Sequence, residues 1–219
     1  MSIALSLGNN LTTGGIFKPT AVNNTSVNNV TDFASIAGGG TLILLSTQTA
    51  SASASISFTT GIDSTYDEYI FKFINCHPSV DDVDFFVNFS TDGGSNYNVT
   101  KTTTLFYNYH DEADTQTGLV YDIDYDLAQS TDRQEIAISV GNGSDECLSG
   151  YLHLFQPSSN TFVKHFISNT NGYGGNDISW NVRVAGYGNT TSAINAVQFT
   201  MESGNIDDGI IKMYGLVKS

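Results

Sequence analysis

A regular alternation of side-chain type between residues 67 and 97 constrains the fold of this chain more than any other feature. Aromatic and β-branched residues at every second position are typical of β-strands, because successive side chains of a strand point to opposite faces. Clusters of turn-forming residues, Pro78-Ser79 and Asp92-Gly93-Gly94, follow the two alternating segments. We therefore predict two strands, whose inward faces carry Tyr69, Phe71 and Phe73 in the first and Val83, Phe85, Val87 and Phe89 in the second.

The rest of the chain repeats this pattern, with about eleven short strands in all and no segment that holds a helical period over two turns. The expected fold class is all-β, an antiparallel jelly-roll-like β-sandwich with an extended N-terminal arm. Uneven spacing and long loops favour the jelly roll over an immunoglobulin-type sandwich, whose Cys…Trp…Cys pattern is absent. Individual expectations are a buried strand at 41–47, a hairpin of 147–155 with 161–168, a strand at 119–126 and a Gly-rich loop at 169–177.

Residues 1–39 differ from the body at 40–219, since Asn, Thr and Gly dominate them. Such a segment is too polar to form its own core, yet it is too apolar for a purely solvated linker. We expect an extended arm that anchors the chain to a particle or interlaces subunits, with Gly38–Gly40 as its hinge. A disordered tail is the alternative. The candidate anchoring residues are Ile3, Leu5, Leu7, Ile16, Phe17, Phe33 and Ile36.

The charge balance excludes some classes of partner. Eight basic and 22 acidic residues give a net charge of −14, which repels nucleic acid. No apolar run reaches the length of a membrane span, and the first residues lack the basic start of a signal peptide. We expect neither nucleic-acid binding nor membrane insertion. The two cysteines, Cys76 and Cys147, are interpreted as free thiols, with a disulfide as the alternative.

No catalytic constellation is evident, and we expect no enzyme activity and no cofactor. The four histidines lie in unrelated contexts, although His153 and His165 are possible cross-strand neighbours in the expected hairpin. A nucleophile requires a base and a third group that orients the base. Carboxylate pairs of the kind that glycosidases use carry no signal in a chain with 22 acids.

Two groups of residues remain as weak candidates for binding. Three carboxylates on one face of the expected strand at 119–126 repel one another, and calcium would relieve this repulsion. The EF-hand template fails there, because Leu127 and Arg133 replace its glycine and glutamate, so a solvated acidic face is the alternative. Tyrosines near glycines at 171–175 and 187–188 suit either a glycan-contacting rim or plain packing. The residues concerned are Asp122, Asp124 and Asp126 for calcium, and Tyr173 and Tyr187 for glycan.

Several separated stretches resemble, in the same order, a β-domain of virion proteins from tailed bacteriophages, marine phages in particular. They are FTTGIDSTYDEYIFKFINCHPSVDDVDFFVNFSTDGGSNYN at 58–98, LSGYLHLFQPSSNTFVKHF at 148–166 and GNIDDGIIKMYGLVKS at 204–219. The resemblance covers most of 41–219. It implies a jelly-roll-like structural component of a virion, either a fibre, a spike or a capsid decoration, that is often trimeric and not enzymatic.

The function expected from this resemblance is therefore that of a non-enzymatic virion protein, located in the virion and contacting other capsid or tail proteins, as a homo-trimer. The alternative is a receptor-binding tip domain of a tail fibre that recognises host surface glycans. A glycan depolymerase is a third hypothesis.

Overall fold

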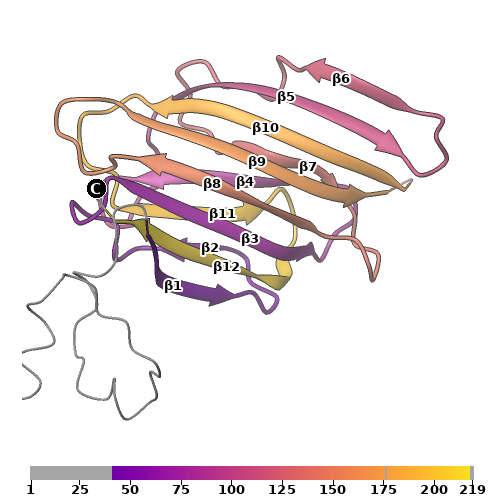
Figure 1. Ribbon diagram of the computed structural model, residues 1–219, viewed down its shortest axis with the longest axis horizontal. Coiled ribbons are helices and arrows are strands. Elements are labelled where there is room, and N and C mark those ends of the chain that lie inside the picture. The colour runs from indigo at the N-terminus through magenta and orange to yellow at the C-terminus, as the bar shows by residue number, and fades with distance from the viewer. Residues whose placement is uncertain (1–40, 176, 218–219) are drawn as a thin grey trace, which may run out of the picture. The chain divides into compact units, whose positions relative to one another are not determined.

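Twelve β-strands, and no helix, form residues 41–175 and 177–217, the part of the chain that the computed structural model describes (Figure 1). Because the alternation and turn chemistry recur throughout, almost every strand lies where an alternating segment predicts one. The strands are β1 (Leu42–Thr49), β2 (Ile56–Phe58), β3 (Glu68–Pro78), β4 (Val83–Ser90), β5 (Lys101–Asp111), β6 (Thr117–Tyr121), β7 (Gln134–Val140), β8 (Leu148–Phe155), β9 (Lys164–Gly174), β10 (Ile178–Gly188), β11 (Ala196–Met201) and β12 (Ile206–Leu216).

The strands form two antiparallel sheets of unequal size. The large sheet has eight strands in the order β1-β12-β3-β8-β9-β10-β5-β6, and the small sheet has four in the order β2-β11-β4-β7. Figure 1 looks onto the outer face of the large sheet, with the small sheet behind it. This arrangement confirms the predicted all-β, jelly-roll-like sandwich and the pairing of β8 with β9 as a hairpin.

An aromatic core joins the two sheets. Phe199 of β11 lies at its centre, with ring centroids 5.1 to 6.4 Å from those of four other phenylalanines. These are Phe58, Phe71, Phe73 and Phe85. All seven predicted inward residues of β3 and β4 are buried, which confirms the interpretation of 67–97 as two strands. Aromatic rings at this spacing, in edge-to-face or stacked geometry, stabilise a core beyond the area that they bury.

A loop, and not a strand, covers the inner face of the large sheet beyond β10. Residues 122–133 pass beneath β5 and are tied to it by backbone bonds, among them the amide of Thr103 to the carbonyl of Leu127, 2.9 Å. Tyr125 packs against the core from this loop. Strand β6 lies beyond this cover, and Leu119 at its middle is 73% exposed.

Three local predictions were wrong. The apolar segment 41–47 forms an edge strand, in which Leu42, Ile43 and Leu44 are 37 to 50% exposed, because β1 has a neighbour on one side alone. The predicted strand at 119–126 ends at Tyr121, since the Asp122 carboxylate accepts the amide of Asp124 and makes a turn. The predicted loop at 169–177 is mostly strand, because β9 continues to Gly174.

The chain divides into two units, residues 1–38 and 39–219, and the described residues belong to the second. The predicted arm at 1–39, with all of its candidate anchoring residues, lies outside the described residues.

Candidate functional site

The two tyrosines predicted to form a glycan rim lie far apart. In the pairing of β9 with β10, Tyr173 is opposite Ser179 and Tyr187 is opposite His165. Positions 179 and 187 are separated by about 26 Å at the usual rise of a strand. The Tyr173 hydroxyl donates a hydrogen bond to Asp177, 2.9 Å, which raises the pKa of Tyr173 to about 12. The two rings therefore cannot contribute to one rim.

The three aspartates considered for calcium do not share a strand face. They lie in the turn after β6, where Asp122 accepts the amide of Asp124 and Asp126 accepts the Tyr121 hydroxyl at 2.6 Å. In residues 41–175 and 177–217, no group of three or more histidine, cysteine or acidic side chains is arranged to hold a metal ion.

The histidines of the β8–β9 hairpin have separate partners. Ile167, and not His165, is opposite His153, which is hydrogen-bonded through Nδ1 to Glu68 on β3. His165 packs against the ring of Tyr187 on β10, with centroids 6.0 Å apart. The two imidazoles are therefore not cross-strand partners.

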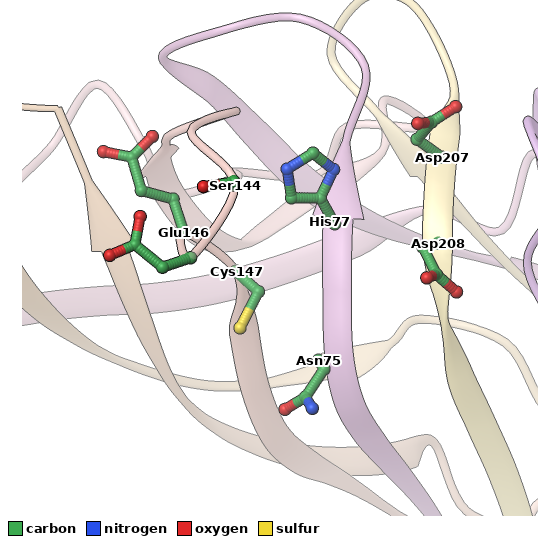
Figure 2. A pocket seen from close by; sticks show the side chains of 8 residues that line it. Asn75, His77, Ser144, Glu146, Cys147, Asp207 and Asp208 are labelled. Atoms are coloured by element: carbon green, nitrogen blue, oxygen red, sulfur yellow. The ribbon is translucent and has the colours of Figure 1, made fainter.

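A pocket of about 490 Å³ lies at one end of the sandwich, where β3 and β12 meet the loop before β8 (Figure 2). Both cysteines are free thiols here, Cys147 in the pocket wall and Cys76 in the core. Burial raises the pKa of both thiols, that of Cys76 to about 12. His77 Nε2 lies 3.1 Å from the carbonyl oxygen of Gly143. The raised pKa values keep both thiols mostly protonated at neutral pH, and the thiolate is the nucleophilic form.

A cluster of charged residues lies on the outer face of the small sheet. Burial raises the pKa of Asp84 to about 6 and that of Glu135 to about 7, with further contributions from nearby carboxylates. Arg133 stacks on the ring of Phe86, 4.0 Å from its centroid, and donates to the carbonyls of Met201 and Glu202. The guanidinium is thus engaged by carbonyl groups and neutralises the two carboxylates only in part.

This cluster predicts a stability that falls as the pH rises. Both pKa values are higher in the folded protein than the ordinary values, so the stabilising contribution is complete below about pH 4 and is lost as the pH passes through 6 and 7. We expect a loss of about 1 to 2 kcal/mol between pH 5 and pH 8, after allowance for solvent screening. Urea unfolding across this range measures it. Asp84→Asn with Glu135→Gln should flatten the profile, whereas exposed Glu112→Gln should leave it unchanged; an equal slope in all three proteins would contradict the assignment.

A row of seven side chains crosses the outer face of the large sheet and is the strongest candidate for a functional surface. Register places each member directly opposite the next on seven consecutive strands from β12 to β6. At the usual strand spacing the row is about 29 Å long. We call it the cross-strand row; its members are Lys212, Lys72, Tyr151, Asn169, Arg183, Phe106 and Tyr121.

The electrostatics of this face differ from those of the whole chain, whose net charge is −14. Along the outward positions of β3, β8, β9, β10 and β5, all within the described residues, Glu68 alone carries a carboxylate, and it is hydrogen-bonded to His153. The lysines and arginines of residues 41–175 and 177–217 are Lys72, Lys101, Arg133, Lys164, Arg183 and Lys212. Three of these six belong to the cross-strand row.

The other three basic side chains are engaged elsewhere. Lys101 and Lys164 are fully buried, and their ammonium groups donate to carbonyl oxygens of Val99, Phe162 and Thr190. Burial lowers the pKa of Lys101 to about 8. Arg133, in the loop before β7, stacks on Phe86 of the small sheet. The remaining cationic groups of the described surface are therefore concentrated on the row, where the Lys72 ammonium lies 5.5 Å from the ring centroid of Tyr214.

Large apolar side chains accompany these cations. Tyr151 and Phe106 are each 39% exposed and Tyr121 is 54% exposed. Ile167, beside the row, is 49% exposed. Exposed apolar groups gathered on one face mark surfaces that bind a partner. The arrangement can bind and orient a ligand; it holds no nucleophile with an activating base.

Sequence reasoning missed this surface. The signal was present, since a cation interrupts the apolar alternation at Lys72, Arg183 and Lys212. The order of the strands, which aligns these three positions, does not follow from local pattern.

Because the described residues contain no helix, none of their segments could cross a membrane as an apolar helix. Comparisons with protein-family models, with curated proteins and with solved structures found no match to this chain.

Proposed function

We propose that this chain is a non-enzymatic structural protein of a bacteriophage virion, a capsid decoration, spike or fibre component anchored through its N-terminal residues. The observation that carries the proposal is the outer face of the large sheet, on which exposed apolar and basic side chains gather while the body as a whole is acidic. Such a face supports a role in contacts with other molecules. The jelly-roll-like fold agrees with the resemblance of 58–98, 148–166 and 204–219 to virion β-domains.

The proposed protein has two working parts. Residues 1–39 join it to the particle or to neighbouring copies in a homo-trimer, and the sandwich projects its large sheet. Strand β1 supports this division, because its exposed apolar residues directly follow the arm and one of its edges has no neighbouring strand within residues 41–175 and 177–217. An unpaired edge can accept a further strand, which is a common mode of protein attachment.

Removal of residues 1–37 should leave a folded body that no longer joins particles. The sandwich begins at Leu42 and its core contacts lie within residues 50–213, so the far-ultraviolet circular dichroism of a strand-rich protein should persist. Occupancy on purified particles, measured by mass spectrometry after expression beside the intact chain, should fall at least tenfold.

A matched control replaces residues 1–37 by a Gly/Ser segment of equal length, which restores length but not sequence. If the protein without residues 1–37, or the one with the Gly/Ser segment in their place, reaches full occupancy on particles, the proposal that the arm anchors the chain is wrong. Labelled particles imaged by electron microscopy would then show which site the body itself occupies.

A second candidate function is host recognition, in which the body is a receptor-binding tip domain for surface glycans. The cross-strand row favours it, because aromatic rings, an amide and cations alternate along one line. Tyr173 and Tyr187, at opposite ends of the β9–β10 pair, would lie outside such a site.

A further inference from the structure

We propose that the cross-strand row is a binding site for a linear acidic polysaccharide, with Arg183 as its main anionic contact. The inference rests on the second candidate function and gives it a place and a ligand class. Arg183 projects from the middle of β10 between the buried residues Val182 and Val184, and it is exposed. Its guanidinium has no hydrogen-bond or ion-pair partner within residues 41–175 and 177–217.

The charges suit a carboxylated or sulfated ligand. A free guanidinium presents a planar fork of donors that matches a carboxylate in two parallel hydrogen bonds. Lys72 and Lys212, directly opposite each other on β3 and β12, extend the positive charge along the row. Among the outward positions of β3, β8, β9, β10 and β5, the single carboxylate, that of Glu68, is hydrogen-bonded to His153, and at the β6 end of the row Asp126 accepts the Tyr121 hydroxyl. An anionic chain therefore meets no unpaired negative charge along the described strands β3, β8, β9, β10 and β5.

The rings are placed for a chain of sugars. Tyr151 on β8 and Phe106 on β5 are three strands apart, about 14 Å at the usual spacing, and Tyr121 follows on β6. Between the first two lie Asn169 and Arg183. The C–H faces of pyranose rings are apolar and pack on aromatic rings, while hydroxyl and carboxylate groups at their edges need polar partners. Along the row, the rings of Tyr151 and Phe106 can pack on the C–H faces of sugars. Asn169 and Arg183 between them can bind the hydroxyl and carboxylate groups.

Amide groups beside the row are held in fixed orientations. Asn181 donates to the Asn169 side-chain oxygen at 2.7 Å and to the Thr170 carbonyl at 2.8 Å. Asn171 donates to Ser179 at 2.8 Å. Register also aligns Asn171, Asn181 and Asn108 across β9, β10 and β5. Preorganised amides lose little conformational entropy when they bind hydroxyl groups.

A protein partner fits this centre less well. The cores of protein–protein interfaces are apolar and depleted of charge, with a polar rim. Here polar and charged side chains lie among the exposed residues Tyr151, Ile167 and Phe106 of the inner strands, so no purely apolar centre forms; Leu44 and Leu119 lie toward the outer strands β1 and β6. This distribution favours a hydroxyl-rich ligand over the surface of another protein or a second copy.

The full-length chain should bind polygalacturonate, a linear polyuronate, and should bind neutral dextran at least tenfold more weakly. Binding measured by calorimetry should weaken as salt is raised, because exposed charges are screened. Arg183→Gln should weaken it roughly tenfold, the effect of one charge-assisted hydrogen bond. Arg183→Lys should recover part of this loss. Tyr151→Ala and Phe106→Ala should each weaken binding several-fold.

Two controls separate the alternatives. Phe162→Ala removes an aromatic ring that is 67% exposed but lies in the loop before β9, and it should leave binding unchanged. Poly-L-glutamate supplies carboxylates without sugar rings and should bind at least tenfold more weakly than polygalacturonate. Circular dichroism of each variant verifies that the sandwich is intact.

The proposal is overturned if polygalacturonate does not bind, if poly-L-glutamate binds equally well, or if the Arg183 and Tyr151 variants bind like the unchanged protein. It is also overturned if sedimentation shows self-association that Arg183→Gln abolishes, since the face would then be a subunit interface. Each of these results leaves the arm-deletion experiment unaffected, so the virion role is judged separately.

Discussion

Phe199→Ala should lower the free energy of unfolding by about 3 to 5 kcal/mol, the range for removal of a large buried aromatic side chain. Phe199 is fully buried in β11 and its ring contacts rings from both sheets, among them Phe73 at 5.1 Å and Phe85 at 5.9 Å. The alanine leaves a cavity between the two sheets. Because strands of both sheets border this cavity, they cannot readily move to fill it. Urea or thermal unfolding measures the loss, with a fall in Tm of roughly 10 °C for a domain of this size.

Phe162→Ala is the matched control, because it deletes the same atoms from an exposed position. It should change the free energy of unfolding by less than about 0.5 kcal/mol. A loss below about 1.5 kcal/mol for Phe199→Ala would contradict a core centred on that ring.

Gly174→Ala should cost about 3 kcal/mol, the upper part of the usual range for overpacking. An added Cβ at residue 174 would lie 1.9 Å from the backbone oxygen of Ser139 on β7. A register irregularity between β4 and β7 accompanies a left-handed backbone at Ser139, with φ of 49°. A carbonyl cannot rotate aside as a flexible side chain can, so the two sheets must separate locally.

The neighbouring glycine supplies the comparison. An added Cβ at Gly175 would have no heavy atom within 4 Å, and the backbone there is not in the left-handed region. Gly175→Ala should therefore be nearly neutral in the same unfolding experiment. Equal stabilities of the two variants would mean that the close approach of β7 to β9 is not present in solution.

Gly174 also explains why one sequence prediction failed. Glycines at 172 and 174 suggested a loop, because glycine is most common in turns. In the structure both are buried in strand β9, where the small sheet passes close to the large one. A glycine needed for close approach and a glycine needed for a turn look the same in the sequence. The predicted glycan rim combined Tyr173 of this segment with Tyr187, and the two lie about 26 Å apart along the strand direction.

The parts of the fold that could be predicted are those in which each strand carries its own signal. Alternation at 69–73 and 83–89 identified inward faces correctly, because both strands are covered on one side by the other sheet. The apolar run at 42–45 led to a wrong prediction of a buried strand. Burial depends on which strands pair with a segment, and β1 lies at the edge of its sheet. The cross-strand row required the order of seven strands, which no local pattern contains.

The order of strands also has a consequence for how the protein is made. β12 lies between β1 and β3 in the large sheet, and β11 lies between β2 and β4 in the small one. Each sheet is thus completed in its interior by a strand that follows all of its other strands in the sequence. Strands β1 and β2, and one edge each of β3 and β4, stay unpaired until residues 196–216 have been synthesised. Pairing between such distant segments is slow and leaves the nascent chain prone to aggregation. The complete sandwich is therefore expected to fold only after residues 196–216 have been synthesised. A chain that stops before them could pair β3-β8-β9-β10-β5-β6 and β4-β7, but β1 and β2 would have no neighbouring strand.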